Sequence, residues 1–146
     1  MPETDKFVRE YPDGGDVREV RGNRGRRTMG GVTDQLLSAR ALVMRDLEAT
    51  GVAGPEVVSI LEDAVVERRW WADQWPAGAV YVDGLVAQDV QDALLERVGR
   101  WPLCTACSDD DTHPLYIHPE LGGPDPQWVC EHSGHVIAPL GGLAGR

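Results

Sequence analysis

The sequence predicts an α+β fold in which a three-helix bundle is followed by a small β-hairpin module. Apolar residues recur with helical spacing between residues 33 and 99. Proline and glycine signals divide that region into three segments of about 15–20 residues. After residue 107, short β-like runs around a strong turn signal replace the helical period. A chain of 146 residues is long enough for one compact domain, or for a helical core with an appended module.

We expect three regions: an arm over residues 1–28, an α-helical domain over residues 29–100 and the β-hairpin module over residues 101–146. The arm shows no period and mixes charges of both signs with glycine and proline. Residues 18–27 contain five arginines. This composition buries too little apolar surface to offset the entropy of ordering the chain. The arm is therefore expected to be disordered, or to become ordered on an acidic partner such as nucleic acid or another copy of the chain.

The boundaries of the three helices follow from cap residues and prolines. The first helix is expected to begin after Thr33, its N-cap, and to end before Gly51. The second runs from Pro55 to Trp75, because the residue before a proline disfavours the helical conformation. A short extended piece or turn over residues 79–82 leads to the third helix, from about Leu85 to residue 99. The predicted apolar stripes are Leu36, Leu37, Val43, Met44 and Leu47, then Val57, Val58, Leu61, Ala64, Val65, Trp71 and Ala72, then Val86, Val90, Ala93, Leu94 and Val98.

Four tryptophans, Trp70, Trp71, Trp75 and Trp101, belong to the helical region or border it. They could pack in the core and cover the C-terminal module, or form a surface that binds another protein, where tryptophan is enriched. Adjacent residues of a helix cannot both face one core. At least one of Trp70 and Trp71 is therefore expected to be exposed.

The C-terminal module contains two β-like runs, residues 115–117 and residues 128–129, separated by a turn signal at residues 122–126. Tyr116 is out of phase with its apolar neighbours. Residues 136–140 are expected to form either a third short strand or a packed tail. This pattern predicts a hairpin that brings the segments on either side of it together.

All three cysteines and all four histidines lie between residues 104 and 135, which predicts a metal site. The two-residue gap of Cys104-x-x-Cys107 lets both sulfurs bind one ion, and zinc favours thiolate and imidazole ligands. Cys130 supplies a third sulfur. His113 is the preferred fourth ligand and His135 is the alternative, whereas His132 is too close to Cys130 and His118 fits an exposed strand position. The predicted zinc ligands are Cys104, Cys107, His113 and Cys130.

Residues 101–143 resemble a zinc ribbon in the order of their segments. A metal-binding turn with the pattern Cys-x-x-Cys, called a knuckle, is followed by a strand, a glycine-rich turn, a second strand and a cysteine. A zinc ribbon has a second Cys-x-x-Cys, and here Ser133 stands where its last cysteine would be. The runs His113-Pro114-Leu115, Trp128-Val129-Cys130 and residues 138–141 look like small zinc-ribbon proteins of high-GC Gram-positive bacteria and their tailed phages. That resemblance implies a small accessory or virion-associated role.

Charge and composition limit the partners that we expect. The net charge is −10, and residues 29–146 hold seven Lys/Arg against eighteen Asp/Glu. So acidic a body repels phosphate, which leaves residues 18–27 as the only expected contact with nucleic acid. We expect neither a signal sequence nor a membrane-spanning segment, and the odd number of cysteines fits a reducing site of synthesis. We expect a protein made in the cytosol that assembles with itself or with a protein partner.

A catalytic zinc is the alternative to a structural one. His118-Pro119-Glu120 matches the His-x-Glu of zinc deaminases, but there it precedes the cysteine pair and here it follows. A site of three cysteines and one histidine also leaves no coordination position for water. We therefore expect a non-enzymatic protein for structure, assembly or protein interaction. A nucleic-acid-associated regulator is the first alternative, and a zinc hydrolase or deaminase is less favoured.

Overall fold

The computed structural model describes residues 17–107, 112–120 and 122–144, with the backbone alone for residues 17–30. The chain divides into two units, residues 1–31 and residues 32–146. The first unit holds the beginning of helix α2 (Val17–Ala49), and the second holds the rest of α2 and every later element. Residues 1–16 of the predicted arm lie outside the described residues. The ordering of this arm on a partner stays a prediction.

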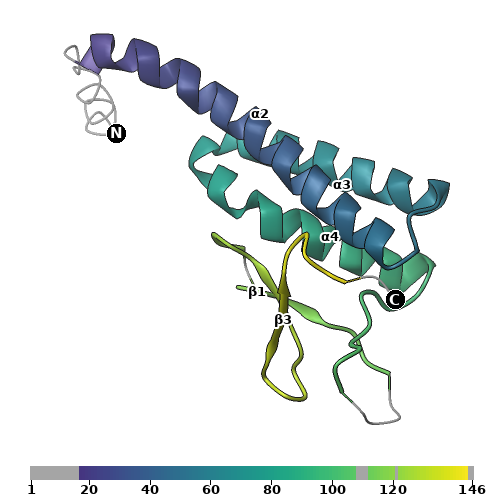
Figure 1. Cartoon of the computed structure of the whole chain (residues 1–146). Coiled ribbons are helices and arrows are strands. Elements are labelled where there is room, and N and C mark those ends of the chain that lie inside the picture. The colour runs from purple at the N-terminus through teal and green to yellow at the C-terminus, as the bar shows by residue number, and fades with distance from the viewer. Residues whose placement is uncertain (1–16, 108–111, 121, 145–146) are drawn as a thin grey trace, which may run out of the picture. The chain divides into compact units, whose positions relative to one another are not determined.

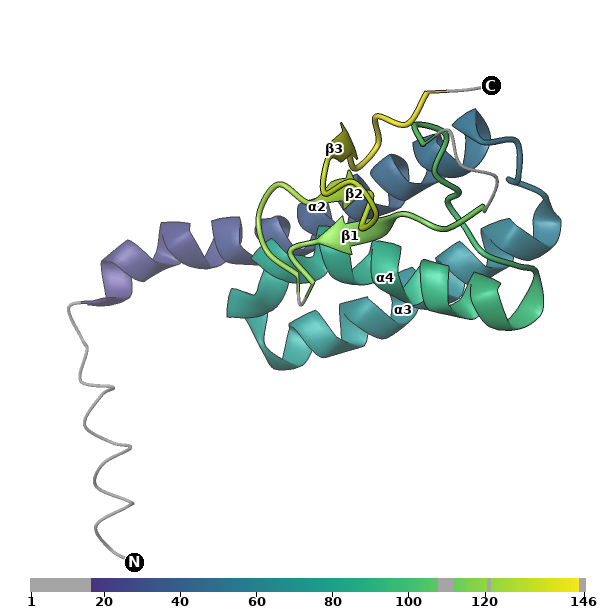
Figure 2. The ribbon, with the colours of Figure 1, turned by 90° about the horizontal axis from the view of Figure 1, so that it is seen from below.

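The second unit is a mixed α+β structure of helices and one small sheet (Figure 1). After α2 come the helices α3 (Pro55–Gln74), η1 (a 3-10 helix, Pro76–Tyr81) and α4 (Val82–Arg97), and then the strands β1 (Tyr116–His118), β2 (Gln127–Val129) and β3 (Val136–Pro139). The sheet lies on one side of the helices, with β1 next to α4 in both views (Figures 1 and 2). The predicted fold class is confirmed at this level.

Helix α2 begins earlier than the sequence analysis predicted. It starts at Val17, so Thr33 is an interior residue and not an N-cap. Glycine lowers helix stability by about 1 kcal/mol but keeps the backbone N–H that proline lacks, so Gly30 and Gly31 do not end the helix. Two predicted core positions are also wrong, because the side chains of Leu37 and Val98 are 59% and 56% exposed.

The predicted ends of α2 and α3 agree with the structure. Gly51 has φ +76° and directly follows the last turn of α2, where its N–H donates to the carbonyl of Glu48. Helix α3 begins at Pro55 and ends immediately before Trp75. Residues 79–82 were predicted as a short extended piece or turn; the end of the 3-10 helix η1 and the start of α4 occupy them, so the extended alternative is wrong.

Gly78 explains why η1 replaces an extended segment. A Cβ at this position would lie 2.5 Å from a ring atom of Trp75 and 2.8 Å from one of Trp71. Without that Cβ, the chain passes closely over the two indoles at the end of α3. A 3-10 turn then leads directly into α4, which begins three residues earlier than predicted.

The sheet is antiparallel in the order β1-β2-β3, so β3 extends the predicted hairpin. Ile117 pairs with Trp128, and both side chains are buried. Tyr116 and His118 point away from the core and are exposed, as their phase predicted. The pairing of β2 with β3 is irregular between Trp128 and Val129.

The sheet and the helices share one hydrophobic core. Trp128 is fully buried and meets the ring of Trp101 edge to face, with ring centroids 5.4 Å apart. The indole N–H of Trp101 donates to Thr50 Oγ1 at 2.9 Å, and that of Trp128 donates to Asp46 Oδ2 at 2.8 Å. Both tryptophans therefore hold the C-terminal segment against the end of α2. No helix in the described part of the chain has the length and apolar character needed to cross a membrane.

Candidate metal centre

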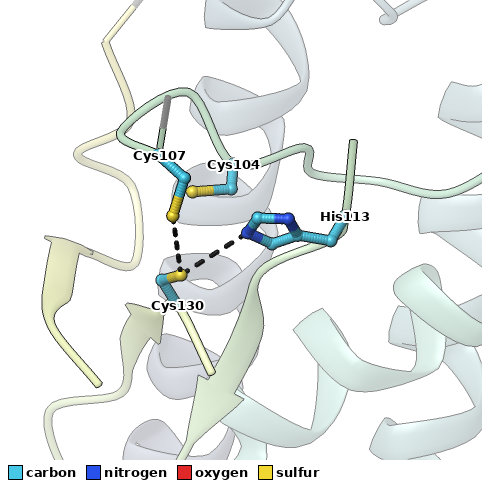
Figure 3. A group of neighbouring side chains, drawn as sticks. All are labelled: Cys104, Cys107, His113 and Cys130. Carbon is cyan, nitrogen blue, oxygen red and sulfur yellow. Dashed lines mark hydrogen bonds between the residues drawn. The ribbon is translucent and has the colours of Figure 1, made fainter. Parts of the chain in front are cut away.

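A short antiparallel pairing positions the first knuckle, Cys104-x-x-Cys107. Leu103 and Pro114 form an isolated bridge, the N–H of Cys104 donates to the carbonyl of His113 at 2.8 Å, and the N–H of Leu115 donates to that of Pro102 at 2.7 Å. These bonds place Cys104 beside His113. Cys107 returns toward the same point after the intervening turn (Figure 3).

The second knuckle is a tight loop at the end of β2. The N–H of Gly134 donates to the carbonyl of Cys130 at 2.7 Å, and the N–H of Cys130 donates to that of His135 at 3.0 Å. Gly134 adopts φ +78°, a left-handed conformation that glycine accepts without strain. The loop presents the buried Cys130 sulfur to the first knuckle (Figure 3).

Four side chains converge on one point: Cys104, Cys107, His113 and Cys130. Their ligand atoms all lie within 4.8 Å of one another, so the group could hold a metal ion. The Cys107 and Cys130 sulfurs are 3.6 Å apart, and the Cys130 sulfur is 3.5 Å from His113 Nε2. In a tetrahedral zinc site, bond lengths of ~2.3 Å to sulfur and ~2.0–2.1 Å to nitrogen give ligand separations of about 3.5–3.8 Å. The Cys107–Cys130 and Cys130–His113 separations therefore fit a tetrahedral ion.

Ser133, at the place of the missing ribbon cysteine, acts on Cys130 without replacing it as a ligand. Its backbone N–H donates to the Cys130 sulfur at 3.4 Å. The side chain and backbone of Ser133, with His113 and Cys107, lower the pKa of the Cys130 thiol to about 5 against the opposing effect of burial. The pKa of Cys107 is raised to about 12, chiefly by its hydrogen bond to Cys130. The surroundings of Cys130 therefore favour its thiolate, the form of cysteine that binds a metal.

The other three histidines lie outside the four-residue group. His132 is exposed, but its ring stacks on that of His113 with centroids 3.9 Å apart and planes inclined by 19°. His135 is exposed, and its backbone N–H donates to Ser133 Oγ. His118 is an exposed residue of β1 and lines a groove together with Glu120. His118 and Glu120 do not belong to the candidate metal group found among the described residues.

Sequence reasoning missed two functional features of this centre. The contact of His132 with His113 depends on how two loops meet, and no spacing in the sequence signals it. The hydrogen bond from the Ser133 N–H to the Cys130 sulfur was not predicted either, because Ser133 was considered only as a possible metal ligand. The convergence of the two knuckles, by contrast, follows the spacing of the cysteines.

The fold and the site together define a class: a small α+β protein with a candidate metal centre of three cysteines and one histidine. The chain belongs to a family described as a domain of unknown function (DUF8819), which matches residues 32–140. That match includes α2 from residue 32 onward, the later helices, the sheet and all four residues of the centre. No curated protein and no solved structure matches the chain.

Proposed function

We propose that this chain is a non-enzymatic zinc-binding protein with a structural role in protein interaction or assembly. The convergence of Cys104, Cys107, His113 and Cys130 within 4.8 Å is the observation that carries the proposal. Three thiolates and an imidazole suit zinc, whereas magnesium and calcium take oxygen ligands.

A structural zinc is supported by what the ligands join. Cys104 and Cys107 precede β1, whereas Cys130 follows β2, so one ion would close the open end of the hairpin. Trp101 and Trp128 lie close to these ligands in sequence and pack in the shared core. Ion binding would therefore stabilise the attachment of the sheet to the helices.

The absence of catalysis is part of the proposal. Four protein ligands complete a tetrahedral shell, and a catalytic zinc needs an open position for water or substrate. His118 and Glu120, the pair that matched a deaminase signature, line a groove and are not in the metal group. This arrangement favours a zinc that holds a shape.

An exposed apolar edge between α2 and α3 supports a role in protein interaction. Arg40 of α2 and Glu62 of α3 form an ion pair between the two helices. Leu37 lies one turn before Arg40, and Val66 lies one turn after Glu62, followed after another turn by Trp70. Val66 and Trp70 are each 67% exposed, and exposed tryptophan is typical of binding surfaces. Its exposure also confirms that Trp70 and Trp71 do not both face the core.

A role in a virion or other particle is proposed from the resemblance of the C-terminal segment to zinc-ribbon proteins of tailed phages. Under this proposal the acidic body repels nucleic acid, and the partner is a protein.

The metal content of the purified chain tests the proposal. Native mass spectrometry should find one zinc per wild-type chain and none for Cys130→Ser, because serine is a poor zinc ligand. His118→Ala is the control, since His118 is an exposed residue of β1 outside the group of four, and this variant should keep the zinc. A folded wild-type chain without zinc, or a Cys130→Ser variant that still holds one, would show that the proposed centre is wrong.

A further inference from the structure

A groove of about 690 Å³ runs between α4 and the edge strand β1. Asp92 and Leu95 line it from α4, Tyr116 and Ile117 from β1, and Glu120 and Glu131 from the segments that follow β1 and β2. The buried Trp101 also lines it, together with the exposed Leu95 and Tyr116. The groove therefore combines an apolar base with an acidic rim.

Among the described residues, no cation forms a salt bridge with the acidic rim. Within residues 31–107, 112–120 and 122–144, none of Asp92, Glu120 and Glu131 takes part in a salt bridge. Arg100 also lines the groove, but its guanidinium donates to the carbonyl and the Oγ1 of Thr112, at 3.1 and 3.3 Å. Its donors are therefore directed to the loop before β1 and not to the three carboxylates.

Neighbouring carboxylates add to the negative potential of this rim. The pKa of Asp92 is raised, first by partial burial and then by the charges of Asp89 and Glu96. A cation bound beside Asp92 would relieve both repulsions. Asp89 itself forms a salt bridge with Arg68 at 2.6 Å, so we do not count it among the carboxylates that bind the cation.

The shape and lining of the groove select the kind of cation. The partly exposed Tyr116 and Leu95 offer a ring face and an aliphatic surface, which suit the planar guanidinium and the apolar stem of arginine better than a compact ammonium ion. The edge strand β1 lies along one wall and favours an extended segment beside it.

We propose that this groove docks an arginine-rich peptide segment of a partner protein in an extended conformation. The guanidinium groups pair with Asp92, Glu120 and Glu131, and the arginine stems cover the apolar surface formed by Leu95 and Tyr116. This inference rests on the proposed role in protein interaction and names the chemistry of the partner.

Fluorescence anisotropy of a short labelled peptide that alternates arginine and serine tests the inference on the full chain. Wild type should bind it, more weakly as salt rises, and should prefer it to the lysine–serine peptide. The double variant Asp92→Lys/Glu120→Lys should lose at least about tenfold in affinity, which corresponds to ~1.4 kcal/mol. The matched control is Asp63→Lys/Glu67→Lys, which makes the same charge change at exposed positions of α3.

The outcomes separate this inference from the zinc proposal, because zinc content is measured on the same samples. Loss of binding in the groove variant, with binding kept in the α3 control, supports the docking site. Equal loss in both variants would mean a general attraction to an acidic surface and would overturn it. Wild-type chain that contains one zinc but does not bind the peptide would overturn the docking site and leave the zinc proposal intact.

Discussion

Asp46 is the buried charged residue of the described core, and three N–H groups surround its carboxylate. Oδ2 accepts hydrogen bonds from the Trp128 indole at 2.8 Å and from the Gly141 N–H at 2.7 Å, while Oδ1 accepts one from Leu143 N–H at 2.9 Å. One side chain of α2 thereby holds both β2 and the segment after β3. A buried carboxylate is tolerated when such donors replace the water that it loses.

Replacing Asp46 with asparagine should destabilise the fold by about 2–4 kcal/mol, because an amide NH₂ would then face an N–H donor and the charge-assisted bonds would be lost. Urea denaturation measures the change. Asp34→Asn is the control, since Asp34 is an exposed residue of the same helix, and it should change stability by less than about 0.5 kcal/mol. Equal stability of the Asp46 variant and wild type would contradict this role.

His132 should support the metal ligand His113 through the stacking of their rings. His132→Ala should weaken zinc binding by about tenfold, as is common when a neighbour that orients a ligand is lost. His132→Phe keeps a stacking ring and should restore most of the affinity, and His135→Ala should have little effect. Competition with a chromophoric chelator measures these affinities. If His132→Ala and His135→Ala bind zinc equally, the stacking has no role in binding.

At the scale of elements, the segment after β3 passes close to α2 at Gly141. Gly141 has φ +88°, and a Cβ there would lie 2.5 Å from Leu42 Cδ2 and 3.3 Å from Leu42 Cβ. Gly134 has a similar φ of +78° but open space around the Cβ position. Alanine at Gly134 would therefore add backbone strain alone, whereas alanine at Gly141 would add both backbone strain and a clash with Leu42.

Gly134→Ala should cost about 1 kcal/mol, the strain of a left-handed alanine. Gly141→Ala should cost about 2–3 kcal/mol, because Leu42 must also move. Thermal unfolding of both variants provides the comparison. A Gly141 variant no less stable than the Gly134 variant would show that the segment does not pack on α2 as described.

The sequence was a good guide to elements with local signals. Gly51, Pro55 and the Trp75-Pro76 pair mark helix ends by backbone chemistry, which does not depend on the rest of the fold. The start of α2 was wrong because glycine is a weak helix breaker, and η1 was missed because the close approach at Gly78 depends on Trp71 and Trp75.

The same distinction applies to the site and the core. The spacing of Cys104 and Cys107 is local, and the hairpin that brings Cys130 to them has a recognisable turn. The contact of His132 with His113 and the bonds of Asp46 arise between distant segments, so periodicity does not reveal them. One signal for Asp46 is present in the sequence, because this residue interrupts the apolar stripe beside Leu47. Such an interruption signals a buried polar group.

At the scale of the whole molecule, Trp101 and Trp128 belong to the hydrophobic core that the helices share with the segments of the candidate metal centre. The predicted division into a helical domain (residues 29–100) and a C-terminal module (residues 101–146) stays a prediction. Since the core is shared, removal of zinc by a chelator should lower the melting temperature of the helices as well as disturb the sheet. At free zinc about 1,000-fold above its Kd, the ion contributes about 4 kcal/mol.

Circular dichroism at far-ultraviolet and near-ultraviolet wavelengths checks this coupling. Both signals should melt together, and at a lower temperature after chelation. If the helical signal melts at an unchanged temperature while the tryptophan signal is lost, the helices are stable without the metal centre and the two are not coupled.

X-ray absorption at the zinc edge tests the central claim most directly, because it counts the ligands of the ion. We predict three sulfur ligands at about 2.3 Å and one nitrogen ligand at about 2.0–2.1 Å, with no bound water. A shell with fewer sulfurs and a water oxygen would contradict a closed site formed by Cys104, Cys107, His113 and Cys130.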